Sequence, residues 1–286
     1  MSAPLLEKAS AKINLTLRVL GRRADGYHDL ESLVVFADLA DRLTLQPGET
    51  TALDVSGPFA AASGNVADNL VLKALAGLRQ RIPGVKAGHF LLEKNIPAAA
   101  GVGGGSADAA AALRLLARAN GIALDDPRLA AVALEVGADV PVCLASRACV
   151  MRGVGDKLAP PLDLPAMPAV LVNPRVAVPT RDVFAKFSSS HGSKNNIGEV
   201  PPTADAMVAF LEQHGNDLTQ GAIACSPVIA EVLEALRALP GVRLSRMSGS
   251  GATCFALFAT LGEASAAASM LQAAHKNWWV CAATLK

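Results

Sequence analysis

Pro97-Ala98-Ala99-Ala100-Gly101-Val102-Gly103-Gly104-Gly105-Ser106-Ala107 is the stretch that organises this chain. It follows an apolar run at 88–94 that is typical of a strand, and it opens an alanine-rich run at 106–119 that is typical of a helix. Glycines lack a Cβ atom, so backbone N–H groups in such a loop can crowd around an anion, and the following helix adds unpaired N–H groups and the positive end of its dipole. Four glycines within five residues favour an anion-binding loop over an ordinary tight turn, which needs only one or two.

The two best-known phosphate loops do not fit this stretch. A P-loop needs a lysine and then a serine or threonine after its last glycine, whereas Ser106 and Ala107 follow Gly105 directly. The dinucleotide fingerprint G-x-G-x-x-G matches at Gly101 and Gly103, but its third glycine would have to be Ser106. The sequence therefore predicts a phosphate loop of a third type, which has no lysine of its own.

Length and composition bound the class of protein. The 286 residues are enough for two domains, and the glycines and prolines between 151 and 168 put the expected boundary near 158, giving domains 1–158 and 159–286. Hydrophobic residues make up 51% of the chain and charged residues 18%, which is a globular composition. Because the net charge is only +1, we expect no nucleic-acid partner and no membrane partner, and a small molecule as the ligand instead.

Cysteines, histidines and the N-terminus indicate the compartment. The five cysteines are odd in number, far apart and form no C-x-x-C pair, so we expect buried thiols in a reducing environment. No apolar run has the length of a membrane span, and charges interrupt the first 14 residues before a signal peptide could form, which predicts a cytoplasmic protein. The five histidines form no metal-binding cluster, so any metal is expected to arrive with a nucleotide.

The N-terminal segment combines an alternating run with a polar loop. Apolar and polar residues alternate from 11 to 20, which predicts a half-buried strand with Lys12 and Asn14 about 7 Å apart on one face. From spacing alone, an ordinary solvated face is favoured for this pair. The loop at 21–30 carries Tyr27 beside His28, a combination that can stack on a base and hydrogen-bond to it, although a tyrosine that packs its loop onto the domain is the commoner case.

The remaining pattern predicts a mixture of strands and helices, an α+β protein. Strands are expected at 32–39, 42–46 and 52–55 in a largely antiparallel sheet, and later at 169–172, 243–247, 253–259 and 278–285. Helices are expected at 68–82, 126–136, 204–214, 227–239 and 263–276. A polar stretch at 188–203 is expected to form a mobile loop.

The spacing of residues leaves the roles of two further turns open. Asp139 follows the helix expected at 126–136, with a proline two residues on, and spacing alone predicts a turn aspartate rather than a catalytic one. The stretch Ser248-Gly249-Ser250-Gly251-Ala252 lies between two expected strands. It forms either a bare hairpin or a second wall for a bound phosphate, and spacing slightly favours the hairpin.

Three separated motifs together resemble the GHMP small-molecule kinases, and the resemblance spans nearly the whole chain. The stretch 97–107 resembles the P-x-x-x-G-L-G-x-S-S-A phosphate loop of that family, and 248–252 resembles its C-terminal glycine motif. Ala11-Lys12-Ile13-Asn14-Leu15 with Gly21-Arg22-Arg23-Ala24-Asp25-Gly26-Tyr27-His28 is similar to one branch of the family, whose acceptor carries a cytidine diphosphate moiety. The resemblance implies a two-domain α+β fold, with an N-terminal domain like the second domain of ribosomal protein S5, a ferredoxin-like C-terminal domain, and substrates between them.

The resemblance also implies a reaction, the transfer of the γ-phosphoryl group of ATP to a hydroxyl group. Asp139 would be the catalytic base and Lys12 its partner, because a carboxylate accepts the hydroxyl proton and an ammonium keeps that carboxylate ionised. Residues 97–107 would hold the triphosphate, and Ser106 would lie near the Mg²⁺ that accompanies ATP. Positioning and electrostatics are expected to dominate the rate.

For the acceptor, the resemblance implies a pocket that takes the cytidine diphosphate moiety. The cytosine would lie between Tyr27 and Phe184, and hydrogen bonds would come from Asn14 and His28. Stacking supplies affinity for a base, and contacts to its edge supply the choice of base. Thr180 and, two residues further on, Asp182 lie close enough to Phe184 in the sequence to line the same pocket.

The chain departs from the family pattern at four positions. Val102 replaces the usual leucine of the loop, Ala107 replaces its second serine, and Cys143 replaces an aromatic residue that often follows the aspartate motif. Asp108 stands where a neutral asparagine is common, which puts a negative charge close to the expected phosphates. A helix N-terminus tolerates a carboxylate, but this charge can weaken ATP binding.

Other interpretations stay open from the sequence. Another GHMP kinase, such as a homoserine kinase, would share the glycine loops but lack the pair Tyr27 and His28. A nucleotide-binding regulatory module would bind ATP without turnover, and an S5-like RNA-binding module would need a basic face. The oligomeric state, monomer or homodimer, is also left open.

Overall fold

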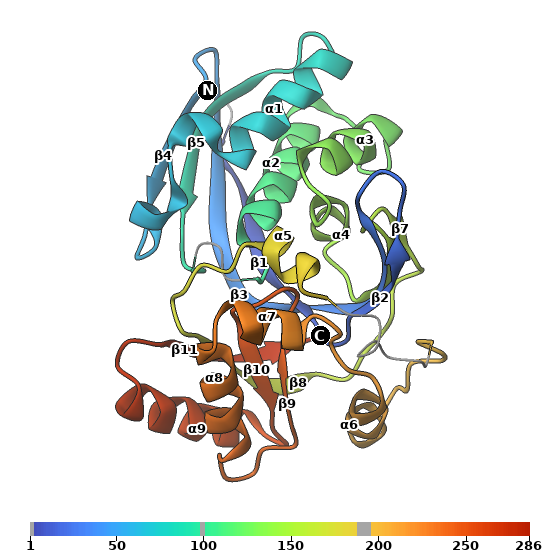
Figure 1. Cartoon of the computed structure of the whole chain (residues 1–286). Coiled ribbons are helices and arrows are strands. Elements are labelled where there is room, and N and C mark those ends of the chain that lie inside the picture. The colour runs from blue at the N-terminus through green and yellow to red at the C-terminus, as the bar shows by residue number, and fades with distance from the viewer. Residues whose placement is uncertain (1–2, 98–100, 188–195) are drawn as a thin grey trace. The chain divides into compact units, whose positions relative to one another are not determined.

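The computed structural model describes residues 3–97, 101–187 and 196–286, which form two compact units (Figure 1). Unit 1 comprises Met1–Ala11, Leu39–Ala98 and Gly103–Ser146, and unit 2 comprises Lys12–Asp38, Ala99–Val102 and Arg147–Lys286. The domain boundary expected at 158 stays a prediction. Part of the expected mobile loop, 188–195, and three residues of the glycine loop, Ala98, Ala99 and Ala100, lie outside the described residues.

The N-terminal strands depart from the sequence-based expectation. The chain forms β1 (Leu5–Asn14), β2 (Arg18–Arg22) and the long β3 (His28–Gly48), and it passes from one unit to the other within β1 and β3. The prediction of one continuous half-buried strand at 11–20 is therefore wrong, because β1 ends at Asn14 and every residue from 11 to 18 is buried. The solvated face expected for Lys12 and Asn14 is also wrong, since their exposed fractions are 3% and 1%. The runs expected as separate strands at 32–39 and 42–46 form the single strand β3.

Unit 1 combines a small sheet with a group of helices. In its sheet, β5 (Ala87–Glu93) pairs antiparallel with Arg42–Gly48 of β3 and parallel with β4 (Ala52–Ser56). Two 3₁₀ turns, η1 (Ala60–Ser63) and η2 (Val66–Asp68), lead into α1 (Leu70–Arg81). The helices α2 (Gly104–Asn120), α3 (Pro127–Val136) and α4 (Val140–Ala145) follow β5, and in Figure 1 α3 and α4 lie on the side of α1 and α2 that faces away from β4 and β5.

Helix α2 is the buried centre of unit 1. Every residue from Ala107 to Ala117 except Arg114 is buried. The small alanine side chains let α1, α3 and α4 approach it closely, which explains why an alanine-rich helix can be packed on several sides. The side chains of Asn69 and Asp126 cap the N-termini of α1 and α3, accepting from the backbone N–H groups of Val71 and Arg128.

Unit 2 is built on an antiparallel sheet. Its strands run in the order β11-β8-β10-β9, and β3 also pairs with β2, β6 and β11; the bounds are β6 (Cys149–Gly153), β7 (Lys157–Leu158), β8 (Met167–Asn173), β9 (Leu244–Met247), β10 (Cys254–Leu257) and β11 (Trp279–Leu285). The helices are α5 (Thr180–Ala185), α6 (Ala204–Gln213), α7 (Thr219–Cys225), α8 (Val228–Arg237) and α9 (Leu261–Ala274). Apolar residues of α8 and α9 form one core with those of β8 and β10.

Most of the long elements are confirmed and the short helices were missed. The helices expected at 126–136, 204–214, 227–239 and 263–276 and the late strands are present within a few residues of their expected bounds. Helices α4, α5 and α7 have only six or seven residues, which is less than the window in which a helical period becomes visible.

The cysteines and the helices give two further observations. All five cysteines are free, and three of them are buried. No helix in the part of the chain that the structure describes is long and apolar enough to cross a membrane.

Candidate functional site

The start of α2 in unit 1 has the backbone of an anion-binding loop. Gly103 occupies the N-cap position in the left-handed conformation, with φ of 65°, and as a glycine it has no side chain to cap the helix. Helix α2 begins at Gly104, two residues before the expected start at Ser106. The first-turn N–H groups therefore lack a capping side chain within the described ranges, which is the arrangement that a phosphate or carboxylate fits.

The turn that carries Asp139 lies beside this helix start. Helix α3 ends at Val136, and Asp139 is the half-buried N-cap residue of α4. A Cβ atom built on Gly137 would lie 4.0 Å from the Ser106 hydroxyl oxygen, so unit 1 brings Ser106 next to the Asp139 turn. Arg114 of α2 fixes α4 from the other end, because its guanidinium donates to the carbonyl oxygen of Cys143 at 2.8 Å.

In unit 2, the end of β1 lies against the other part of the glycine loop. The backbone N–H of Lys12 donates to the carbonyl oxygen of Val102 at 2.9 Å. The N–H of Asn14 donates to the Ser248 hydroxyl oxygen at 3.1 Å, and that hydroxyl lies 3.4 Å from the carbonyl oxygen of Gly101. Within unit 2 the structure thus joins the segment of Lys12 and Asn14 to Gly101 and Val102. The pairing of Lys12 with Asp139, which belongs to unit 1, stays a prediction.

The second glycine motif is a hairpin that also abuts the first one. Strands β9 and β10 pair antiparallel on either side of it, which confirms the hairpin. A Cβ atom on Gly101 would lie 2.2 Å from the carbonyl oxygen of Gly251, so the two backbones touch at a distance that only glycine permits. The side-chain amide of Asn216 donates to the carbonyl oxygens of Met247 and Gly249 at 2.8 Å each and holds the turn. The segment 248–252 can therefore be a hairpin and still form a second wall for a bound phosphate.

Asn14 presents an unused acceptor at this place. Its side-chain amide nitrogen donates to the Ser32 hydroxyl at 2.7 Å. Its Oδ1 atom is buried and has no hydrogen-bond partner among the residues that the structure describes. A Cβ on Gly249 would lie 3.3 Å from this oxygen, so the acceptor faces the glycine turn.

The residues expected to hold the acceptor are partly brought together in unit 2. The rings of His28 and Phe184 stack with centroids 4.7 Å apart, and the hydroxyls of Thr180 and Ser250 lie 2.9 Å apart. Burial, with a smaller contribution from the charge of Arg22, lowers the pKa of His28, so its ring favours the neutral form. Tyr27 is 62% exposed. One face of Phe184 is thus covered by His28, and a base stacked on Phe184 has to use its other face or displace His28.

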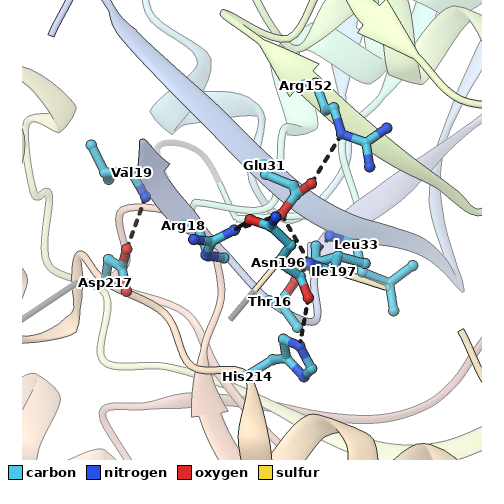
Figure 2. A network of polar contacts seen from close by, with 10 residues as sticks. All are labelled: Thr16, Arg18, Val19, Glu31, Leu33, Arg152, Asn196, Ile197, His214 and Asp217. Atoms are coloured by element: carbon cyan, nitrogen blue, oxygen red, sulfur yellow. Dashed lines mark hydrogen bonds and ion pairs between the residues drawn. The ribbon is translucent and has the colours of Figure 1, made fainter. Parts of the chain in front are cut away.

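Figure 2 shows a buried carboxylate network in unit 2 that the sequence does not reveal. Glu31 accepts from Arg152 at 3.0 Å, from Arg18 at 2.9 Å and from the backbone N–H of Ile197 at 3.0 Å. Arg18 also donates to the side-chain oxygen of Asn196 at 2.7 Å. Burial alone would raise the pKa of Glu31, but these donors outweigh it and lower that pKa. The network attaches the segment at 196–197 to β2 and β3.

Asp108 is buried in an ion cluster of unit 1. Lys94 Nζ donates to Asp108 Oδ2 at 2.6 Å and also to Asp41. Burial and the neighbouring Asp41 raise the pKa of Asp108, although the Lys94 ammonium acts in the opposite direction. The effect of Asp108 on ATP binding stays a prediction, but its charge is engaged by Lys94. Sequence reasoning missed Lys94 and Asp41, which no spacing rule connects to Asp108.

A cleft of about 370 Å³ opens beside β4 in unit 1. The backbone N–H of Phe59 donates to the carbonyl oxygen of Lys94 at 3.2 Å, so the segment after β4 is attached to the strand that leads into the glycine loop. The lining is mixed, with apolar side chains beside polar ones: Leu53, Asp54, Val55, Ala60, Ala61, Ser63, Gly64, Val66 and Asn69.

Comparison with known proteins decides the family. The model of the GHMP kinase N-terminal domain matches residues 69–147, and that of the C-terminal domain matches residues 202–277. A 4-diphosphocytidyl-2-C-methyl-D-erythritol kinase from a Bradyrhizobium species is 57% identical over 99% of this chain and 97% of the relative. One from Rhodopseudomonas palustris is 57% identical over 98% of each chain. The chain belongs to the 4-diphosphocytidyl-2-C-methyl-D-erythritol kinase family of GHMP kinases.

Solved structures agree with this family and with its mixed α+β fold. A crystal structure of a 4-(cytidine 5'-diphospho)-2C-methyl-D-erythritol kinase matches with a TM-score of 0.82 and 37% identity, over 98% of this chain and 99% of the other. A homoserine kinase from Cytophaga hutchinsonii matches with a TM-score of 0.73 but only 18% identity, over 99% and 95% of the two chains, and shows the fold alone. The GHMP kinase resemblance and the α+β fold class are thus confirmed.

Proposed function

We propose that this chain phosphorylates the 2-hydroxyl group of 4-diphosphocytidyl-2-C-methyl-D-erythritol with ATP, giving the 2-phosphate and ADP. The reaction belongs to the non-mevalonate (methylerythritol phosphate) pathway of isoprenoid precursor synthesis, and we place it in the bacterial cytoplasm. The observation that carries the proposal is the identity of 57%, over nearly the full length, to two kinases that bear this substrate in their names. For the alternative acceptor homoserine, the homoserine kinase neighbour is 18% identical and shows the fold alone.

Two features of unit 1 support ATP as the phosphoryl donor. The uncapped N-terminus of α2 supplies N–H groups and the positive end of the helix dipole to the triphosphate. The cleft beside β4 has the mixed lining that a nucleoside requires, and we assign the nucleoside end of ATP to it. Residues 97–107, including the undescribed Ala98, Ala99 and Ala100, are the proposed phosphate-binding loop.

Asp139 and Lys12 are the proposed catalytic pair. In this role the Asp139 carboxylate accepts the proton of the acceptor hydroxyl as its oxygen attacks the γ-phosphorus. The Lys12 ammonium offsets the negative charge of the transferring group. The position of Ser106 beside the Asp139 turn supports this assignment, because it puts the phosphate loop next to the proposed base within one unit.

Mg²⁺ is the proposed companion of ATP. Among the described residues there is no group of three or more histidine, cysteine, aspartate or glutamate side chains that could hold a metal ion. Magnesium in kinases is held mainly by substrate phosphates, water and one or two side chains, so this chain fits an ion delivered with ATP. The Ser106 hydroxyl, at the start of α2, is the side chain that would contact it, and the ion would neutralise charge on the phosphates.

Asn14, Tyr27, His28, Thr180 and Phe184 are the proposed acceptor-binding residues. The exposed Tyr27 ring is available for stacking on cytosine, and the half-buried Phe184 ring, which stacks on His28, is the proposed second aromatic partner. The unused Oδ1 atom of Asn14 can accept a hydrogen bond from a hydroxyl of the acceptor. A ligand hydroxyl there would satisfy a buried acceptor that has no partner among the residues that the structure describes.

The test is ADP release with Mg²⁺, ATP and each of three acceptors: the cytidine compound, mevalonate and homoserine. We expect turnover of the cytidine compound only, with the new phosphate identified by phosphorus NMR. Asp139→Asn should lower kcat by about 100-fold or more, since a general base contributes on that order, and Asp125→Asn, at an exposed position of the same unit, should not. Preferred turnover of another acceptor would refute the proposed substrate, and ATP binding without any turnover would favour the regulatory module.

A further inference from the structure

A buried cluster of three charged side chains lies next to the start of α2. Lys94 Nζ bridges Asp108 Oδ2, at 2.6 Å, and Asp41 Oδ2. All three residues are buried, and all three belong to unit 1. They come from three elements, because Asp41 lies on β3, Lys94 follows β5 and Asp108 lies on α2.

On one side, the cluster holds the segment that leads into the glycine loop. The second oxygen of Asp41 accepts the backbone N–H of Ile96 at 2.8 Å and that of Asn95. The backbone N–H of Lys94 donates to the carbonyl oxygen of Ser56 at 2.8 Å. The entering segment is therefore tied through its backbone to β3 and β4, and through the Lys94 side chain to α2.

On the other side, the cluster lies directly against the first turn of α2. A Cβ atom on Gly104, the first residue of the helix, would lie 3.7 Å from Lys94 Nζ and 3.5 Å from Ile96 Cγ2. Asp108 lies one turn further along the same helix. The ammonium is thus engaged by two carboxylates beneath the helix start, unlike the lysine of a P-loop, which reaches the phosphates itself.

Stability alone does not account for this cluster. Buried ion pairs are often no more stabilising than apolar side chains of the same volume, because desolvation offsets the attraction, whereas they can specify a unique arrangement. The second oxygen of Asp108 is buried and lacks a hydrogen-bond partner within the described part of the chain, which is a further cost. A cluster that is costly and joins both sides of a ligand loop points to a positioning role.

We propose that Lys94 is a positioning residue for the phosphate-binding loop. By bridging Asp41 and Asp108, it holds Gly103–Ser106 at a fixed place relative to the segment that enters the loop, and so presents the first N–H groups of α2 to ATP in one geometry. Lys94 acts through the loop and does not touch the phosphates. The inference rests on the proposed function for its claim that these N–H groups bind ATP.

The test compares two variants that differ only at Lys94. Lys94→Met alone leaves two buried carboxylates face to face and can fail to fold. In Lys94→Met/Asp108→Asn, the new amide can donate to Asp41 and one carboxylate is gone, so the fold is retained. Asp108→Asn alone keeps the lysine bridge and is the reference. Lys86→Met removes an exposed lysine from the same unit and is the control for loss of one positive charge.

Two readouts separate positioning from a general loss of structure. In the ligand-free protein, backbone amides at 103–107 should exchange with solvent about tenfold faster in the double variant than in the reference, with exchange in α3 unchanged. The KM for ATP should rise about tenfold, while the KM for the cytidine acceptor stays within about twofold.

Either of two results overturns the proposal: loop exchange and ATP KM both within about twofold of the reference, or a joint rise of both KM values with loss of protection throughout unit 1. If the parent chain does not phosphorylate the cytidine acceptor with ATP, the proposed function fails. The exchange measurement, which needs no ligand, then still decides the positioning role of Lys94.

Discussion

At the residue scale, Glu31 couples the stability of unit 2 to pH. Its folded-state pKa is lowered, so its contribution to stability is complete above the unfolded value of about 4.3 and is lost as the pH falls through the lower folded value. Glu31→Gln removes the negative charge that accepts hydrogen bonds from Arg18 and Arg152, which should lower the free energy of unfolding by about 2 kcal/mol at neutral pH. The melting temperature of the variant should therefore be lower at about pH 7 and should change less between about pH 5 and pH 3 than that of the parent.

The matched control is Glu212→Gln, an exposed glutamate on α6 of the same unit. It should leave both the melting temperature and its pH dependence close to those of the parent, because exposed charges contribute little. If the melting temperatures of the parent and Glu31→Gln changed equally between about pH 5 and pH 3, the assigned role of the Glu31 carboxylate would be contradicted.

At the element scale, the contact between the two glycine motifs predicts the effect of a single methyl group. Gly101 has a φ of +72°, and a Cβ atom there would lie 2.2 Å from the carbonyl oxygen of Gly251. Gly101→Ala combines backbone strain with a clash against backbone and should cost about 2–4 kcal/mol of unfolding free energy. Gly84→Ala, which has a φ of +84° and open space around its Cβ, isolates the strain and should cost about 1 kcal/mol. Equal losses in denaturant titrations of the two variants would show that the motifs do not touch.

The elements also show what sequence patterns can predict. The period of α8 and the capping aspartate of α3 are local signals, so both helices could be placed from the chain alone. The alternation around Lys12 and Asn14 predicts a solvated face, but a pattern on one strand does not report what covers its second face. The partners of Lys94 lie 53 and 14 positions away, and only the fold brings such residues together.

For the candidate site, some residues follow from local composition, some from the family resemblance and some only from the structure. The glycine loop and its helix follow from local composition, whereas Asp139 follows a pattern that spacing alone assigns to an ordinary turn. Its role is proposed from the resemblance, and the position of Ser106 beside Gly137 adds a physical reason. The contact of Ser248 with Asn14 joins positions 234 residues apart, which no local pattern encodes.

At the scale of the whole molecule, the two units cannot be separated by one cut in the chain. The segment Lys12–Asp38 belongs to unit 2, although it lies far before the boundary expected at 158. Its strand pairs with the end of the chain, because Phe36 and Lys286 exchange backbone hydrogen bonds of 2.9 and 3.0 Å. Asp38 also accepts the N–H of Thr284 at 2.9 Å. A fragment 1–158 therefore contains the Phe36 end of β3 together with β2, β6 and β7, but lacks β11, the partner strand at that end.

We therefore expect that neither fragment, 1–158 or 159–286, folds alone, and that the two together recover structure. The isolated 1–158 chain would expose the buried side chains of β3 and the unpaired backbone groups of a sheet edge, both of which favour aggregation over folding. Near-ultraviolet circular dichroism and hydrogen exchange of the separate and mixed fragments measure this directly. A 1–158 fragment that is monomeric and protects its β3 amides as in the full chain would contradict the shared role of Lys12–Asp38, because that protection would then not depend on β11.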